Sequence, residues 1–158
     1  MRHTPVILIV TSEPAQPQAL VTTVQRMQAT VLTAATWDWA CRLLSRATID
    51  VVITDVNLPD GNWRDLMAYL LNEGLNPCVV VRSAADDPCL WSEVLWRGAY
   101  EMLVDPFSVE EAVRILEGAL RTREYFQLEN ARVAPVAMGR MRADGEPDDI
   151  PVRVESYS

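Results

Sequence analysis

The chain has 158 residues, of which 49% are hydrophobic, which fits one folded domain followed by a short further segment. Its formal net charge of −8 argues against a nucleic-acid-binding protein, because such proteins present broad basic surfaces. No apolar run reaches the roughly 18 residues that a membrane span needs, so we expect a cytoplasmic protein without an anchor or a leader.

The residue types that are rare or absent exclude several kinds of catalytic and metal site. The chain has no lysine, and all fourteen of its cationic residues are arginines, so chemistry that needs a lysine ammonium is excluded. His3 is the only histidine, which excludes a multi-histidine metal site. The three cysteines (Cys41, Cys78 and Cys89) are an odd number without CxxC spacing, which argues against a zinc site or a disulfide framework.

Apolar, β-branched runs alternate with segments of helical spacing along the chain. The helices are expected near Pro14, at 37–46 with Thr36 as its cap, at 62–71 before Gly74, after Asp87-Pro88, and from Ser108 onward. The predicted strands are 6–10, 30–34, 51–54, 78–82 and 101–104. Five such alternations predict an α/β fold, a (βα)5 doubly wound sheet of five parallel strands.

The periodicity ends in the last part of the chain. From about Ala131 the sequence is rich in proline, glycine and acidic residues. We therefore expect a domain over residues 1–125 and a flexible C-terminal tail over 126–158, without a second folded domain.

The ends of the predicted strands carry most of the polar residues of chemical interest. Asp55 directly follows the run Val51–Thr54, and Thr11, Ser83 and Asp105 follow three other strands. Ligands of open parallel sheets bind beyond the carboxyl ends of the strands. These side chains converge if their four strands are neighbours.

Four stretches of the sequence together resemble the receiver domain of bacterial two-component response regulators. They are ILIVTSEP, VVITDVNLPDGNWRDLM, VVVRSAADD and GAYEMLVDPFSVEEAVRIL, and the resemblance covers about residues 5–122. It implies a flavodoxin/receiver-like fold and a non-enzymatic role in phosphorelay signal transduction. It also implies that Asp55 is the phosphoacceptor position, that Asn57 offers a backbone carbonyl to Mg²⁺, and that Ser83 supplies the pocket hydroxyl.

The resemblance breaks at the other pocket positions. The acidic pair that holds Mg²⁺ in the family falls on Thr11 and Ser12, with only Glu13 beside them. The family's lysine position is Asp105, and its aromatic switch position is Met102. Mg²⁺ favours carboxylate ligands, and phosphoryl transfer depends on neutralising charge, so the changes at the acidic pair and at the lysine position weaken the expected switch.

The favoured hypothesis is a pseudo-receiver, a stand-alone module that acts by protein–protein interaction, with weak or absent phosphorylation at Asp55 and no cofactor. Its partner would be a histidine kinase, another signalling protein or a second copy of the chain. The alternative is an atypical but phosphorylatable receiver, in which Glu13 and Asp55 hold Mg²⁺ and Arg82 replaces the lysine.

A third hypothesis is a flavin- or metal-binding enzyme on the same fold. The loop TSEPAQPQ lacks the glycine that a flavin phosphate loop favours, and Asn57 stands where an aspartyl-nucleophile enzyme has a second acid. For a metal-binding enzyme, the candidate ligands are the three carboxylates of Glu13, Asp55 and Asp105, which could converge on a divalent cation.

Aromatic residues near the fourth and fifth predicted helices indicate a protein-binding surface. We expect it to include Trp91, Trp96, Tyr100 and Phe107, with Trp96 and Tyr100 the most exposed of the four. In the second predicted helix, Trp37 and Trp39 cannot both face inward, so one of them indicates a second contact patch.

Overall fold

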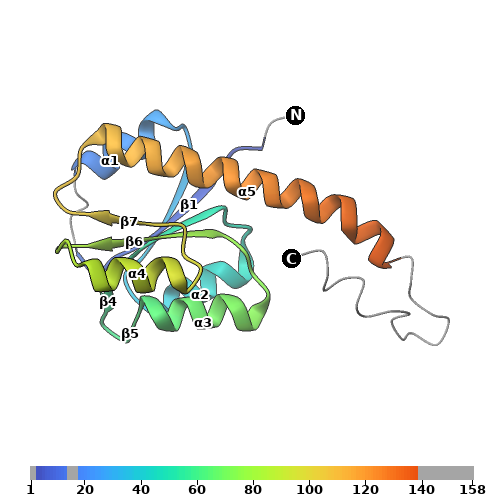
Figure 1. The fold of residues 1–158 in the computed structure, drawn as a ribbon, viewed down its shortest axis with the longest axis horizontal. Helices are drawn as coiled ribbons and strands as arrows, with labels where there is room; N and C mark the ends of the chain where they lie inside the picture. The colour runs from blue at the N-terminus through green and yellow to red at the C-terminus, as the bar shows by residue number, and fades with distance from the viewer. Residues whose placement is uncertain (1–2, 14–17, 139–158) are drawn as a thin grey trace. The chain divides into compact units, whose positions relative to one another are not determined.

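The computed structural model describes residues 3–13 and 18–138, and Figure 1 shows its fold. Five parallel strands form one sheet in the order β2-β1-β3-β6-β7, which confirms the predicted fold class. The strands are β1 Val6–Val10, β2 Thr30–Ala34, β3 Val51–Asp55, β6 Cys78–Ser83 and β7 Glu101–Val104. The four strands whose ends carry polar residues are neighbours, as the convergence of those residues requires.

Helices cover both faces of the sheet. The helices are α1 Gln18–Arg26, α2 Trp37–Arg46, α3 Trp63–Glu73, α4 Pro88–Trp96 and α5 Val109–Met138. Helix α1 and the first part of α5, up to Leu120, pack on one face, and α2, α3 and α4 pack on the other (Figure 1). Side chains alternate between the two cores, as in a strand buried on both faces: Val51 and Ile53 face α1 and α5, and Val52 faces the other layer.

The ends of three helices follow the local sequence. The Thr36 hydroxyl accepts a hydrogen bond from the Trp39 backbone N–H, and the Asp87 carboxylate caps α4 ahead of Pro88. Gly74 ends α3 with a φ of 70°, a left-handed conformation that glycine adopts without strain. Pro14, expected in the first turn of the first helix, lies outside the described residues.

A small hairpin follows β3 and is fastened to a neighbouring helix. It consists of β4 (Asn57–Leu58) and β5 (Gly61–Asn62). At its turn, the Asp60 carboxylate accepts hydrogen bonds from the backbone N–H groups of Trp37 and Asp38, at 2.7 and 3.0 Å. These contacts hold the loop after Asp55 against the N-terminus of α2, where a negative charge is favourable.

The chain divides by its contacts into two units, residues 1–123 and 124–158. Helix α5 continues to Met138, so the expected boundary between residues 125 and 126 falls inside a helix. The segment 139–158, most of the expected tail, lies outside the described residues. Within the part of the chain that the structure describes, no helix is long and apolar enough to span a membrane.

Candidate functional site

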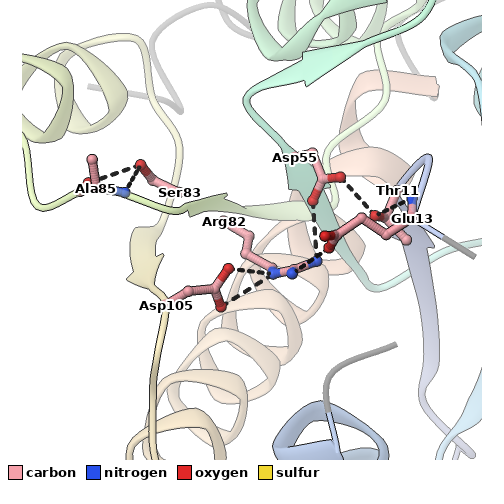
Figure 2. A network of polar contacts seen from close by, with 7 residues as sticks. All are labelled: Thr11, Glu13, Asp55, Arg82, Ser83, Ala85 and Asp105. Atoms are coloured by element: carbon pink, nitrogen blue, oxygen red, sulfur yellow. Dashed lines mark hydrogen bonds and ion pairs between the residues drawn. The ribbon is translucent and has the colours of Figure 1, made fainter. Parts of the chain in front are cut away.

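Arg82 lies at the centre of the polar edge formed by the strand ends (Figure 2). Its side chain is only 8% exposed, and its guanidinium reaches carboxylates from three other segments. Nη2 lies 2.6 Å from Glu13 Oε1, and Nη1 lies 3.3 Å from Asp55 Oδ1. Nε donates to Asp105, at 3.1 Å from Oδ2 and 3.3 Å from Oδ1.

The sheet brings these groups together. Asp55 and Arg82 are partners in the parallel register of β3 and β6, and the Asp105 backbone N–H donates to the Ser83 carbonyl at 2.8 Å. Glu13 reaches the same place from the loop after β1. Burial acts to lower the pKa of Arg82, but its hydrogen bonds to Asp105 and Glu13 outweigh this effect and raise the pKa. The guanidinium is therefore a permanent positive charge in the pocket.

Both carboxylate oxygens of Asp55 have partners. Oδ2 accepts a hydrogen bond from the Thr11 hydroxyl at 2.6 Å, and Oδ1 faces Arg82. Burial raises the pKa of the Asp55 carboxyl, and the Thr11 hydroxyl and the Arg82 charge offset only part of this rise. A hydrogen bond from the Ser12 backbone also lowers the pKa, so both residues at the family's acidic-pair positions bind Asp55.

Ser83 is at the predicted edge, but its hydroxyl has local partners. It donates to the Ala85 carbonyl at 2.8 Å and accepts from the Ala85 backbone N–H at 3.1 Å. Figure 2 shows Ser83 and Ala85 apart from the cluster around Arg82. The hydroxyl that the resemblance assigns to the phosphoacceptor is therefore used in a turn in this structure.

Two further predicted pocket residues lie outside the Arg82 cluster. Asn57 is exposed in β4 and pairs with Asn62 in the hairpin. Met102 is 5% exposed in β7 and belongs to the core beneath α2, α3 and α4. Neither residue contacts Arg82 in the described hydrogen-bonding and ion-pair network.

The donor set does not fit Mg²⁺, the ion that the resemblance implies. Glu13, Asp55 and Asp105 converge, but on the Arg82 guanidinium. No group of three or more histidine, cysteine or acidic side chains that could hold a metal occurs among residues 3–13 and 18–138. In this structure the charge of these three carboxylates is met by the Arg82 guanidinium.

The structure corrects the predicted protein-binding surface. Two of its four expected members are on the surface: Trp96 is 85% exposed and Trp91 is 44% exposed. Phe107 does not belong to this surface, because it is buried in the core between the sheet and α5. Tyr100 is half-buried against the same core.

The two tryptophans of α2 differ in their surroundings. Trp37 makes an edge-to-face contact with Tyr69, with ring centroids 6.5 Å apart. Trp39 is 46% exposed and is the member of the pair that lies on the surface.

Comparison with known sequences identifies the family. Residues 7–117 match the family model of the response regulator receiver domain. The chain belongs to this family. The receiver domain is a signalling module, and the assignment agrees with the five-stranded parallel sheet and with the position of Asp55 after β3.

Curated relatives include three bacterial regulators. The chain is 30% identical over 116 residues to the response regulator protein PilR of Pseudomonas aeruginosa, covering 73% of the chain and 26% of PilR. It is 34% identical over 119 residues to the DNA-binding transcriptional regulator NtrC of Bradyrhizobium sp., covering 75% and 22%. It is 31% identical over 115 residues to the transcriptional regulatory protein KdpE of Mycobacterium tuberculosis, covering 73% and 50%. The matched region therefore spans between 22% and 50% of the length of these relatives.

Solved structures share the fold. The signal receiver domain of a putative LuxO repressor protein from Vibrio parahaemolyticus superposes with a TM-score of 0.73 at 18% identity, covering 80% of this chain and 97% of that one. The beryllofluoride-activated NtrC4 receiver domain dimer has a TM-score of 0.68 at 23% identity, covering 75% and 98%.

From the sequence, Arg82 was expected only as a substitute for the missing lysine. Its link to Asp105 was not predicted, although the sequence contains a hint: a lone arginine ends an otherwise apolar buried strand, and an acid occupies the lysine position. The role of Asp60 as a cap for α2 was also missed, because residues 60 and 37 are far apart in the chain.

Proposed function

We propose that this receiver domain signals by protein–protein interaction and that phosphorylation of Asp55 is weak or absent. The observation that supports this proposal is the Arg82 guanidinium bound between Glu13, Asp55 and Asp105. The three carboxylates are already neutralised in part by a group of the chain itself. The strand ends therefore need neither a metal ion nor a phosphoryl group to be held together.

Charge opposes a phosphoryl group at Asp55. Such a group brings negative charge beside Glu13 and Asp105, and it competes with both for Arg82. Two unit charges about 4 Å apart interact by roughly 4 kcal/mol at an intermediate effective dielectric constant. The Thr11 hydroxyl also donates a 2.6 Å hydrogen bond to Asp55 Oδ2, which makes that oxygen a weaker nucleophile.

The test is incubation with acetyl phosphate and Mg²⁺, followed by intact-mass spectrometry. A phosphorylatable receiver domain in the same reaction serves as the positive control, and Asp55→Asn identifies the acceptor. We expect the wild-type chain to gain no phosphoryl adduct under conditions that label the control. An adduct in the wild type that Asp55→Asn abolishes would instead support the atypical phosphorylatable receiver.

The role of partners is tested separately. If signalling does not depend on phosphorylation, a cognate histidine kinase or other signalling protein binds the wild type and Asp55→Asn with equal affinity. Dimerisation is expected to be equally insensitive to acetyl phosphate. A partner affinity that rises several-fold only with the phosphoryl donor contradicts the proposal.

A further inference from the structure

A cavity of about 310 Å³ opens between α4, β7 and the start of α5. Its apolar lining includes Met102 and Ile115, which are 5% and 3% exposed and belong to the two different cores of the domain. The volume is at the lower end for small-molecule sites. It accommodates one side chain rather than a cofactor.

Trp91 provides an aromatic wall that is held in place. Its indole Nε1 donates to Glu101 Oε1 at 3.0 Å, and the same oxygen accepts from the Met102 backbone N–H at 3.0 Å. Glu101 is thereby fixed to the sheet, and Trp91 is fixed to Glu101. The ring nevertheless remains 44% exposed. A flat aromatic surface of fixed orientation thus borders the cavity.

The charges that line the cavity are predominantly negative. They are the carboxylates of Asp86, Glu101 and Glu111, against the single guanidinium of Arg114. Among the residues that the structure describes, the side chains of Asp86, Glu111 and Arg114 form no hydrogen bond or ion pair. Two of the three carboxylates therefore keep their full capacity to accept hydrogen bonds from a ligand.

We propose that this cavity receives an arginine side chain of a partner protein. The inference rests on the proposed function, in which the domain acts by protein–protein interaction, and it specifies the chemistry of the partner. A guanidinium stacks on an indole face and donates several hydrogen bonds to carboxylates in one plane. The net charge of −8 also favours the approach of a basic partner.

The experiment uses the whole chain and a defined probe. ¹H–¹⁵N spectra are recorded while the peptide acetyl-Gly-Arg-Gly-amide is added, without any phosphoryl donor. The matched control is the same peptide with citrulline, which has nearly the same shape and no charge. We expect the arginine peptide to shift the Trp91 indole N–H and the amides of Met102 and Ile115, with the citrulline peptide causing much smaller shifts.

Two substitutions are expected to change the affinity in opposite directions. Glu111→Gln removes an attractive charge and is expected to weaken binding about two- to fivefold, the range typical of exposed charge pairs. Arg114→Gln removes a competing cation and is expected to strengthen binding by a similar factor. Glu117→Gln alters an exposed acid of the same helix that does not line the cavity, and it is expected to leave the affinity unchanged.

Three outcomes overturn the inference. They are equal shifts with the citrulline peptide, shifts spread over the acidic surface, or equal effects of Glu111→Gln and Glu117→Gln. Shifts of the cavity residues that follow protein concentration rather than peptide would assign the face to a second copy of the chain. None of these outcomes affects the phosphorylation experiment, so the proposed function can stand when this inference fails.

Discussion

Asp105 accepts one bifurcated hydrogen bond from Arg82 Nε, with Oδ2 at 3.1 Å and Oδ1 at 3.3 Å, in the place where related receiver domains are expected to carry a lysine. The sign of the charge at this position is reversed, and the positive charge comes from the neighbouring strand instead. An acid in place of the lysine would by itself leave the strand ends rich in negative charge. Arg82 and Asp105 therefore compensate for each other, and they are best tested together.

Arg82→Met is expected to destabilise the domain. The substitution keeps an unbranched side chain but leaves the half-buried Asp55 and Asp105 without a counter-charge. Loss of one partner from a buried ion pair costs about 3–5 kcal/mol, and the partial exposure of these carboxylates reduces the expectation to about 1–3 kcal/mol. Urea unfolding measures the change. Arg42→Met, at an exposed i,i+4 pair with Asp38, is the control and is expected to cost less than about 0.5 kcal/mol.

Rebuilding the family's pocket is expected to create phosphorylation at Asp55. The variant combines Thr11→Asp, Ser12→Asp, Arg82→Leu and Asp105→Lys, which restores two acids for Mg²⁺ and a lysine for the phosphoryl group. We expect an acetyl-phosphate-dependent mass increase that disappears when Asp55→Asn is added. If the folded variant still gains no adduct, the absent charges are not what prevents phosphorylation.

Asp55 is expected to make the free energy of unfolding depend on pH. Burial raises its folded-state pKa above the unfolded value, so its contribution is fully present below the unfolded pKa and is lost as the pH rises through the folded pKa. The free energy of unfolding of the wild type, relative to Asp55→Asn, is therefore expected to decrease from acidic to neutral pH. A difference that grows over this range contradicts the expectation.

Glu93 is expected to show the opposite dependence. It accepts hydrogen bonds from Arg64 and Arg97, which lower its pKa from 4.5 to about 2. Its stabilising effect is therefore fully present above pH 4.5 and is lost as the pH falls toward 2. The difference in unfolding free energy between wild type and Glu93→Gln is expected to shrink with acidification. A constant difference would indicate that the two ion pairs contribute little.

Gly118→Ala is expected to disturb the packing of α5 on the sheet. A Cβ at this position would overlap the Tyr100 hydroxyl and lie 3.3 Å from Cζ of that ring. Overpacking costs about 1–3 kcal/mol, and alanine offsets about 0.5–1 kcal/mol of this because glycine is unfavourable inside a helix. Tyr100→Phe removes the overlapping oxygen, so Gly118→Ala should be much less harmful in that background, as thermal unfolding of the wild type, the two single variants and the double variant would show. Equal costs in both backgrounds would contradict this explanation.

The strands, and the polar edge formed by their ends, could be predicted because each depends on residues that are close together in the sequence. Each core strand is a short apolar run. These runs alternate with segments of helical spacing, and this alternation indicates a parallel sheet. Asp55 needed only its position at the end of Val51–Thr54 to be placed correctly. The helix ends at Thr36, Gly74 and Asp87 could also be predicted. Each cap depends on the side chain or the backbone freedom of the capping residue itself.

The state of the site depended on contacts between distant segments. Arg82 and its acids come from four segments, and only the register of β3, β6 and β7 places them around one guanidinium. From residue types alone, either a metal ion or an arginine could be the partner of Glu13, Asp55 and Asp105. Ser83 had the expected position, but a hydroxyl can turn toward either side, and its bonds to Ala85 were decided by the loop that follows it.

The sequence by itself determined the α/β fold, the family and the place of Asp55, because short-range patterns of apolar and turn residues specify them. Only the tertiary structure decided that the pocket's cation is Arg82, that Phe107 is buried and that Trp91 borders a cavity. These features depend on which side chains meet across the sheet, and the free energy of each contact depends on the burial and charge of partners that lie far apart in the chain.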